Sequence, residues 1–102
     1  MIVVNHHRNG ITMSGHANYA EHGKDIVCAG VSALVQTLIQ SIEELTQDKI
    51  QYSMQPGTVD IKFRDLSEQA QLLVNSFFVG LELIAGEYPD NVKFFNDQAL
   101  KS

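Results

Sequence analysis

The sequence predicts an α+β fold of order ββαββαβ, in which two helices pack on one face of a mainly antiparallel sheet. Two pairs of short alternating segments are each joined by a turn dipeptide. Each pair is followed by a long stretch whose apolar positions recur at three- and four-residue steps, the spacing of one helix face. Because 102 residues suit one domain, we expect a single domain over residues 1–102.

The first hairpin is predicted from two short segments at the amino end. Residues 2–7 and 11–14 roughly alternate between apolar and polar positions, and Asn9-Gly10 lies between them. Both residues of this dipeptide tolerate the positive φ of a type I′ turn, so we expect a tight hairpin ending near Gly15-His16. Residues 17–24 have no clear period and are predicted to form a loop, with Gly23 as a hinge.

The first helix is predicted to run from about residue 26 to 46. Asp25 is the expected N-cap, because its carboxylate can accept hydrogen bonds from the free N–H groups of the first turn. Gly30 costs a helix interior about 1 kcal/mol relative to Ala, and we interpret it as a close approach to another backbone. The predicted apolar face consists of Val27, Val31, Leu34, Leu38, Ile42 and Leu45.

A second hairpin is predicted over residues 50–64. Apolar and polar residues alternate on both sides of Pro56-Gly57, a dipeptide suited to the two central positions of a type II turn. The alternation predicts one buried face.

The second helix is expected to begin with a capping box formed by Asp65 and Glu68. It should end near Gly86, before Pro89, and residues 92–95 are predicted to form a final strand. This helix is apolar on a second side as well, because Leu72, Val79 and Leu83 lie outside its main stripe: Ala70, Leu73, Val74, Phe77, Leu81 and Ile84. Such a helix is either deeply buried or covered in part by another subunit.

The composition narrows the classes of function. The formal net charge of −5 argues against a protein that binds nucleic acid by neutralising phosphates. The single cysteine excludes an intramolecular disulfide and suits a reducing compartment. The amino end lacks the apolar core of a signal peptide, and polar residues interrupt the most apolar stretch, 72–86. We therefore expect a soluble cytoplasmic protein with no membrane and no direct nucleic-acid partner.

The residues that could carry chemistry lie on both sides of the predicted loop. Ser14-Gly15-His16-Ala17 ends the second strand, and Asp25 to Ser32 opens the first helix. If Asp25 caps the helix, Cys28 occupies its third position, near unpaired N–H groups and the positive end of the helix dipole, where the thiolate is favoured. The His16 imidazole could reach this sulfur across the loop and activate it as a nucleophile, and the same N–H groups could stabilise an oxyanion.

Each of these residues also has a purely structural interpretation. A lone cysteine such as Cys28 is usually buried and inert. His16 could serve as a simple hydrogen-bonding group, and Asp25 could act as an N-cap alone. The Ser32 hydroxyl could bond to a helix carbonyl. Tyr19 is interpreted as a packing ring or a contact to substrate.

A metal or redox sensor is a further alternative. His16, His22, Asp25 and Cys28 could in principle supply four ligands, but no paired-cysteine or histidine spacing typical of metal sites is present. His6 and His7 are adjacent on a strand, so they should point to opposite faces and cannot share an ion. We expect no metal and no cofactor.

Ser-Gly-His-Ala at 14–17, followed by Gly-Lys-Asp-Ile-Val-Cys-Ala-Gly-Val-Ser at 23–32, strongly resembles the ribosomal-processing cysteine protease Prp family. The resemblance covers nearly the whole chain, including Glu87-Tyr88-Pro89-Asp90 and the final strand, and the histidine-to-cysteine segment is its specific part. The chain departs from many relatives at Gly30, where they have Ala.

The resemblance implies a small homodimeric α+β cysteine endopeptidase that removes the N-terminal extension of a large-subunit ribosomal protein, the twenty-seventh of that set. His16 matches the family's general base and Cys28 its nucleophile, while Asp25 and Ser32 match supporting positions. Tyr19 and Gly23 fall in the loop that we expect to close over the substrate. The alternative is a non-catalytic ribosome-assembly or peptide-binding module, which small size and acidity also suit.

Overall fold

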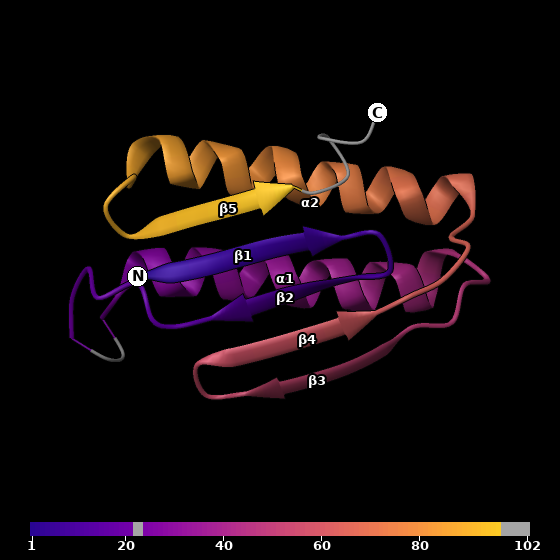
Figure 1. Ribbon diagram of the computed structural model, residues 1–102, viewed down its shortest axis with the longest axis horizontal. Helices are drawn as coiled ribbons and strands as arrows, with labels where there is room; N and C mark the ends of the chain where they lie inside the picture. Colours follow the sequence, from indigo (N-terminus) through magenta and orange to yellow (C-terminus); the bar gives the residue numbers. More distant parts are fainter. Residues whose placement is uncertain (22–23, 97–102) are drawn as a thin grey trace.

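The computed structural model describes residues 1–21 and 24–96 (Figure 1). The predicted order ββαββαβ is confirmed, and most element bounds lie close to the predicted ones. The elements are β1 (Ile2–His7), β2 (Gly10–Ser14), α1 (Ile26–Leu45), β3 (Gln51–Gln55), β4 (Thr58–Lys62), α2 (Glu68–Glu87) and β5 (Val92–Asn96).

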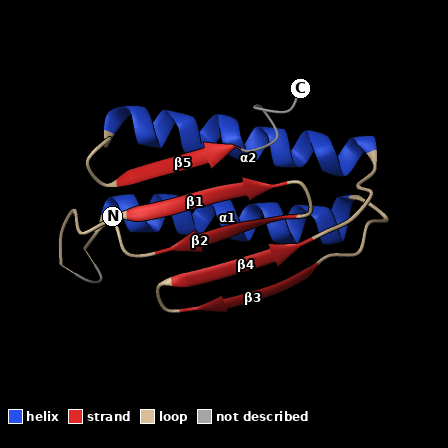
Figure 2. Cartoon of the chain, viewed as in Figure 1, coloured by secondary structure: helices blue, strands red, loops and turns tan. Residues whose placement is uncertain are grey.

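The strands form one sheet of order β3-β4-β2-β1-β5. The pairs β1–β2, β2–β4 and β3–β4 are antiparallel, and β5 pairs parallel to β1. Both helices lie behind the same face of this sheet, α2 along the β5 side and α1 behind β1 and β2 (Figure 2). The predicted α+β class, with helices on one face of a mainly antiparallel sheet, is therefore confirmed.

The core lies between the sheet and the helices. Val4, Ile11 and Ile61, from neighbouring strands, are fully buried, and burial of a side chain of this size contributes about 1.5–3 kcal/mol. By length and composition alone, both helices could also cross a membrane. In this fold each turns a buried stripe to the core: Val27, Val31, Val35, Leu38, Ile39 and Ile42 in α1, and Ala70, Val74, Phe77, Phe78 and Leu81 in α2.

The first hairpin turns one residue earlier than predicted. Arg8 and Asn9 form the turn, while Gly10 already pairs with His7 in the β1–β2 ladder. Neither Asn9 nor Gly10 has a positive φ, so the predicted type I′ turn is wrong. Gly10 is required for a different reason, because a Cβ there would overlap the backbone carbonyl oxygen of Ile61 in β4. At the second hairpin Gly57 has φ 79°, as the predicted type II turn requires.

The predicted cap of the second helix is also wrong. Ser67, not Asp65, is the N-cap of α2, and its hydroxyl accepts a hydrogen bond from the Ala70 N–H. The Asp48 carboxylate, beyond the end of α1, accepts from both the N–H and the hydroxyl of Ser67. This contact fixes the start of α2, and Asp65 lies outside the helix in the left-handed region with φ 52°.

Two expectations about packing, the buried face of the second hairpin and the contact at Gly30, are wrong. All five residues of β3 are exposed, so the predicted buried face of the second hairpin is limited to β4. Tyr52 of β3 is the pairing partner of the buried Ile61, yet its ring is exposed because β3 is the edge strand, beyond the cover of the helices. Gly30 approaches no foreign backbone, since a Cβ there would meet the side chain of Ile84 in α2.

Candidate active site

Cys28 is the third residue of α1, as predicted, and is half-buried. Asp25 is the N-cap, which confirms its expected structural role. One of its carboxylate oxygens, Oδ1, accepts hydrogen bonds from the N–H groups of Val27 and Cys28, at 3.0 and 2.9 Å. The helix therefore begins where the sequence predicts and holds the sulfur in its first turn.

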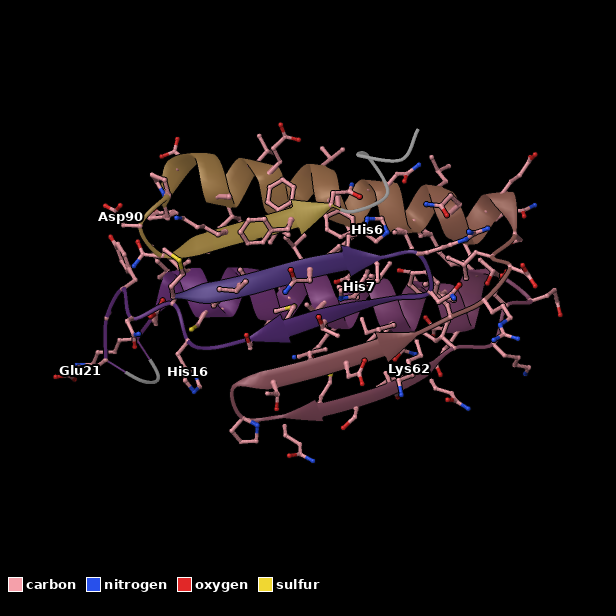
Figure 3. All side chains as sticks on the ribbon, viewed as in Figure 1. His6, His7, His16, Glu21, Lys62 and Asp90 are labelled. Atoms are coloured by element: carbon pink, nitrogen blue, oxygen red, sulfur yellow. The ribbon has the colours of Figure 1, made fainter. Side chains whose placement is uncertain are left out.

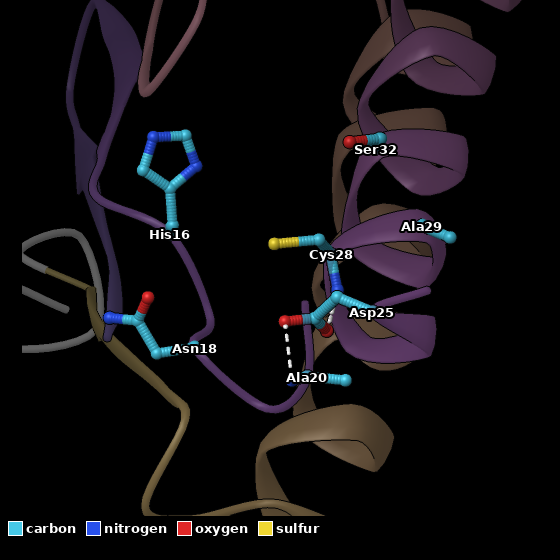
Figure 4. A pocket seen from close by; sticks show the side chains of 7 residues that line it. All are labelled: His16, Asn18, Ala20, Asp25, Cys28, Ala29 and Ser32. Atoms are coloured by element: carbon cyan, nitrogen blue, oxygen red, sulfur yellow. Dashed lines mark hydrogen bonds between the residues drawn. The ribbon is translucent and has the colours of Figure 1, made fainter. Parts of the chain in front are cut away.

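His16 lies just beyond the end of β2, and the Cys28 sulfur points toward it across a hollow of about 460 Å³ (Figure 4). The bend that turns the chain toward the helix occurs at Gly15, which has φ 93° and donates its N–H to the Gly57 carbonyl at 2.9 Å. The ring has room because residue 57 is glycine: a Cβ at Gly57 would lie 3.1 Å from His16 Nε2. No hydrogen bond joins the imidazole to the sulfur in this part of the structure.

Gly15 offers a stability test of this bend. We expect Gly15→Ala to lower the free energy of unfolding by about 2–4 kcal/mol, because alanine is strained at positive φ and its Cβ would overlap the Met1 carbonyl oxygen. Gly86→Ala is the matched control: apart from the neighbouring backbone of α2, no atom lies within 4 Å of its added Cβ, so it should leave stability within about 1 kcal/mol of the parent or raise it. Denaturant unfolding measures both, and equal midpoints would contradict the account of the bend.

The hollow collects residues from the loop and from α1. Ser32, one turn after Cys28, is exposed into it, and its hydroxyl makes no hydrogen bond within residues 1–21 and 24–96, so the alternative of a bond to a helix carbonyl is not observed. The complete lining is His16, Asn18, Ala20, Asp25, Cys28, Ala29 and Ser32. The structure thus brings together four of the predicted site residues: His16, Asp25, Cys28 and Ser32.

The Asp25 carboxylate joins the loop to the helix. Its second oxygen, Oδ2, accepts from the N–H groups of Tyr19 and Ala20, at 2.8 and 3.2 Å. The hydrogen bond from the Cys28 N–H, with help from the loop N–H groups, holds the pKa of this buried carboxyl below its usual value. The carboxylate is therefore ionised at neutral pH, and it fixes the loop beside the first turn of α1.

The N–H groups of Val27, Cys28 and Ala29 are not available for an oxyanion, so for these three groups that expectation is wrong. The N–H groups of Val27 and Cys28 bond to the Asp25 carboxylate, and the N–H of Ala29 bonds to the Asp25 carbonyl at 3.0 Å. Asp25, the N-cap that positions the sulfur, therefore also occupies the backbone N–H donors next to it.

The sulfur itself receives a hydrogen bond that the sequence did not suggest. The backbone N–H of Ala17, the residue after His16, donates to Cys28 Sγ at 3.3 Å. Ala17 is fully buried, and its carbonyl accepts from the side-chain amide of Asn91 at 2.9 Å. No sequence signal relates Asn91 to the site, because it lies beyond α2, far along the chain.

Sequence reasoning also missed Asn18. Its φ of 57° places it in the left-handed region, which asparagine tolerates better than most residues. Its side chain lines the hollow on the same side as His16 (Figure 4). An asparagine in the middle of a short loop was the available signal for this backbone conformation.

The remaining predicted loop residues have separate outcomes. The Tyr19 ring is largely exposed and packs edge-on against Tyr88, with ring centroids 5.2 Å apart, rather than lining the hollow. Gly23 and His22 lie outside the described residues, so the hinge and the fourth metal ligand are not placed. Within residues 1–21 and 24–96, no group of three His, Cys, Asp or Glu side chains is arranged to hold a metal ion.

His6 and His7 lie away from this end of the molecule. His16 and Glu21 lie at the end where β2 finishes, whereas His6, His7 and Lys62 lie toward the other end of the sheet (Figure 3). His6 is buried against the helices, stacked on Phe78 with centroids 4.4 Å apart, and His7 is exposed. The prediction that these two neighbours point to opposite faces is confirmed.

A second hollow of about 310 Å³ adjoins the first and lies between α1 and the β3–β4 turn. It shares His16, Cys28 and Ser32 with the first hollow. Most of its other lining is apolar and includes Ile2, Met13, Val31, Met54, Pro56 and Val59. Cys28 therefore stands between a more polar hollow on the loop side and an apolar one on the hairpin side.

Comparisons with known proteins find similarity over most of the chain. The model of the family described as cysteine protease Prp matches residues 1–93. The chain is 36% identical over 86 residues to the ribosomal processing cysteine protease Prp of Staphylococcus aureus, with 81% of each chain covered. It is also 36% identical over 91 residues to the protein of that name from Bacillus subtilis, with 79% of each covered.

Solved structures agree with this similarity. One is the crystal structure of an essential ribosomal processing protease Prp from S. aureus in complex with a covalently linked product peptide. It superposes with a TM-score of 0.89 at 30% identity, over 95% of this chain and 100% of that one. A complex of the S. aureus protease with a substrate peptide gives a TM-score of 0.79 at 27% identity, over 94% and 97%.

Proposed function

The chain belongs to the cysteine protease Prp family and is a cysteine protease, and we propose that it cuts its substrate with Cys28 as nucleophile and His16 as general base. The observation that carries this proposal is that two separate elements place His16 and Cys28 on opposite sides of one hollow, with the sulfur pointing toward His16. Cys28 is also the single cysteine of the chain, so no other thiol can serve.

The chemistry follows from the two groups. The Cys28 thiol gives its proton to the His16 imidazole, and the sulfur attacks the peptide carbonyl to form a tetrahedral intermediate. The imidazolium returns the proton to the leaving amine as the C–N bond breaks, which leaves a thioester on Cys28. Water, deprotonated by the same imidazole, then cleaves the thioester and restores the thiol.

Stabilisation of the oxyanion falls to side chains. Because Asp25 occupies the Val27 and Cys28 N–H groups, the donors that remain in the hollow include the Asn18 amide and the Ser32 hydroxyl. Asn18 lies on the loop side of the hollow, across from Cys28, and Ser32 lies on α1, one turn beyond Cys28 (Figure 4). Hydrogen-bond donors placed where charge develops lower the barrier of acyl transfer, so we assign these two residues to that task.

We infer that the substrate is the precursor of a large-subunit ribosomal protein, the twenty-seventh of its set, which loses an N-terminal extension. Support comes from the similar proteins, which are named for ribosomal processing, and from one that holds a substrate peptide. An extended peptide lying across Cys28 would enter the apolar hollow on one side and the polar one on the other. The chain's net charge of −5 also suits a basic partner.

The test is to incubate the protein with this precursor and to weigh the products by mass spectrometry. We expect two fragments whose masses add to that of the precursor plus one water. A precursor that binds without being shortened would favour the alternative, a non-catalytic assembly or peptide-binding module. A Prp from one of the similar species, run in parallel on the same precursor, shows whether that precursor can be cut.

We further propose that the protein works as a homodimer in the cytoplasm. Leu72, Val79 and Leu83 are between 62% and 69% exposed and form an apolar stripe on α2, which a second subunit could cover. The lone thiol needs a reducing compartment to stay active. Sedimentation of the purified protein should give twice the chain mass, and a monomer at micromolar concentration would overturn the dimer.

A further inference from the structure

Asn91 lies in the short connection between α2 and β5. Its backbone N–H donates to the Tyr88 carbonyl at 3.0 Å, and its own carbonyl accepts from the Ile2 N–H at 2.9 Å. The backbone of Asn91 is thus tied both to the end of α2 and to the first residue of β1. From this anchored position its half-buried side chain donates through Nδ2 to the carbonyl oxygen of Ala17, at 2.9 Å.

Ala17 connects Asn91 to Cys28, because it is hydrogen-bonded to both. It is 1% exposed, it lies between His16 and Asn18, and its N–H donates to Cys28 Sγ. A thiolate accepts a hydrogen bond more strongly than a thiol, so an N–H aimed at the sulfur favours the reactive form. The direction of that N–H depends on where the backbone of Ala17 is held.

We propose that Asn91 is a positioning residue for the protease: its amide holds Ala17 so that the Ala17 N–H supports the Cys28 thiolate and His16 keeps its place across the hollow. The inference rests on the proposed function, since it requires Cys28 to be the nucleophile. Asp25 fixes the following part of the loop through Tyr19 and Ala20, and Asn91 fixes the part that touches the sulfur.

The variant that tests the contact is Asn91→Asp, which keeps the side-chain shape but replaces the donating amide by a carboxylate that repels the Ala17 carbonyl. We expect kcat for peptide cleavage to fall about tenfold or more, with KM nearly unchanged, because the lost support acts on the sulfur. Asn75→Asp is the matched control, since it adds the same charge on the exposed side of α2, where Asn75 only accepts from Gln71. It should cleave like the parent.

Alkylation by iodoacetamide separates positioning from general loosening. Cys28 is the single thiol, so the rate at pH 7 reports on it alone. Loss of the Ala17 support should slow alkylation about threefold or more, whereas a loosened fold would expose the half-buried sulfur and speed alkylation. Asn91→Ala removes the donor without adding charge and is the second variant if Asn91→Asp does not fold.

The outcomes distinguish this inference from the proposal on which it rests. Slower alkylation together with lower kcat in the Asn91 variants supports the positioning role. Alkylation and kcat equal to those of Asn75→Asp, or faster alkylation, overturn it and leave the Cys28–His16 proposal standing. Cleavage that persists in Cys28→Ala would overturn the Cys28–His16 proposal itself.

Discussion

Cys28→Ala is expected to reduce processing of the precursor by roughly 10⁴-fold or more, because no other thiol can form the acyl intermediate. The measurement is a single-turnover assay with enzyme in excess, read as the mass of the shortened product. The fold should survive, since Cys28 is half-buried and its side chain only accepts one hydrogen bond. Circular dichroism and the denaturant midpoint provide that control.

His16→Ala should cost nearly as much, and the double variant His16→Ala/Cys28→Ala should be no worse than Cys28→Ala alone. Residues that act as one unit in proton transfer and attack are not additive in their losses. His7→Ala is the matched histidine control, because His7 lies on β1 away from the site (Figure 3). If the loss of activity in the double variant equals the product of the two single losses, His16 and Cys28 do not act in one shared step.

The second large effect is expected at Asp25. Asp25→Ala removes the acceptor of four backbone N–H groups, two from the first turn of α1 and two from the loop. We expect activity to fall about a hundredfold, because small displacements of reacting groups have effects of this size, and stability to fall as the N-cap is lost. In Asp25→Asn one oxygen can still accept from the helix, while its NH₂ group faces the N–H groups of Tyr19 and Ala20, so an intermediate loss is expected.

The pH dependence of stability gives a further check on Asp25. Hydrogen bonds, first that from the Cys28 N–H, lower the pKa of this carboxyl in the folded state below the ordinary value of 3.8. Its contribution is therefore complete above that value and is lost as the pH falls through the lowered pKa. Denaturant unfolding at several pH values between 7 and 3 should show the gap between the parent and Asp25→Asn narrowing in acid. A constant gap would contradict this assignment.

Much of the fold could be predicted because local signals determine it. The spacing of apolar residues located both helices, Pro56-Gly57 located a turn that needs a positive φ, and Asp25 marked the start of α1. These features depend on residues within a few positions of one another. The loop between β2 and α1 is short enough that His16 and Cys28 were expected at one end of the fold, and both line the same hollow.

The failed predictions share a dependence on distant contacts. The start of α2 was misplaced because Asp48, well before it in the chain, fixes Ser67 as the cap. Alternation in β3 indicated which side each residue faces, but not whether a helix covers that side. The contact of Asn91 with Ala17 spans 74 residues, and no local pattern can report it.

The contact between Asn91 and Ala17 joins residues that leave the ribosome at different times, because they are 74 positions apart in the sequence. A ribosome releases the amino end first, so His16 and Cys28 emerge well before the residue that holds Ala17 in place. β5, which closes the sheet against β1, emerges later still. A nascent chain therefore holds His16 and Cys28 before Asn91 can contact Ala17, so a positioning role of Asn91, as proposed, would delay full activity until residues 91–96 have emerged.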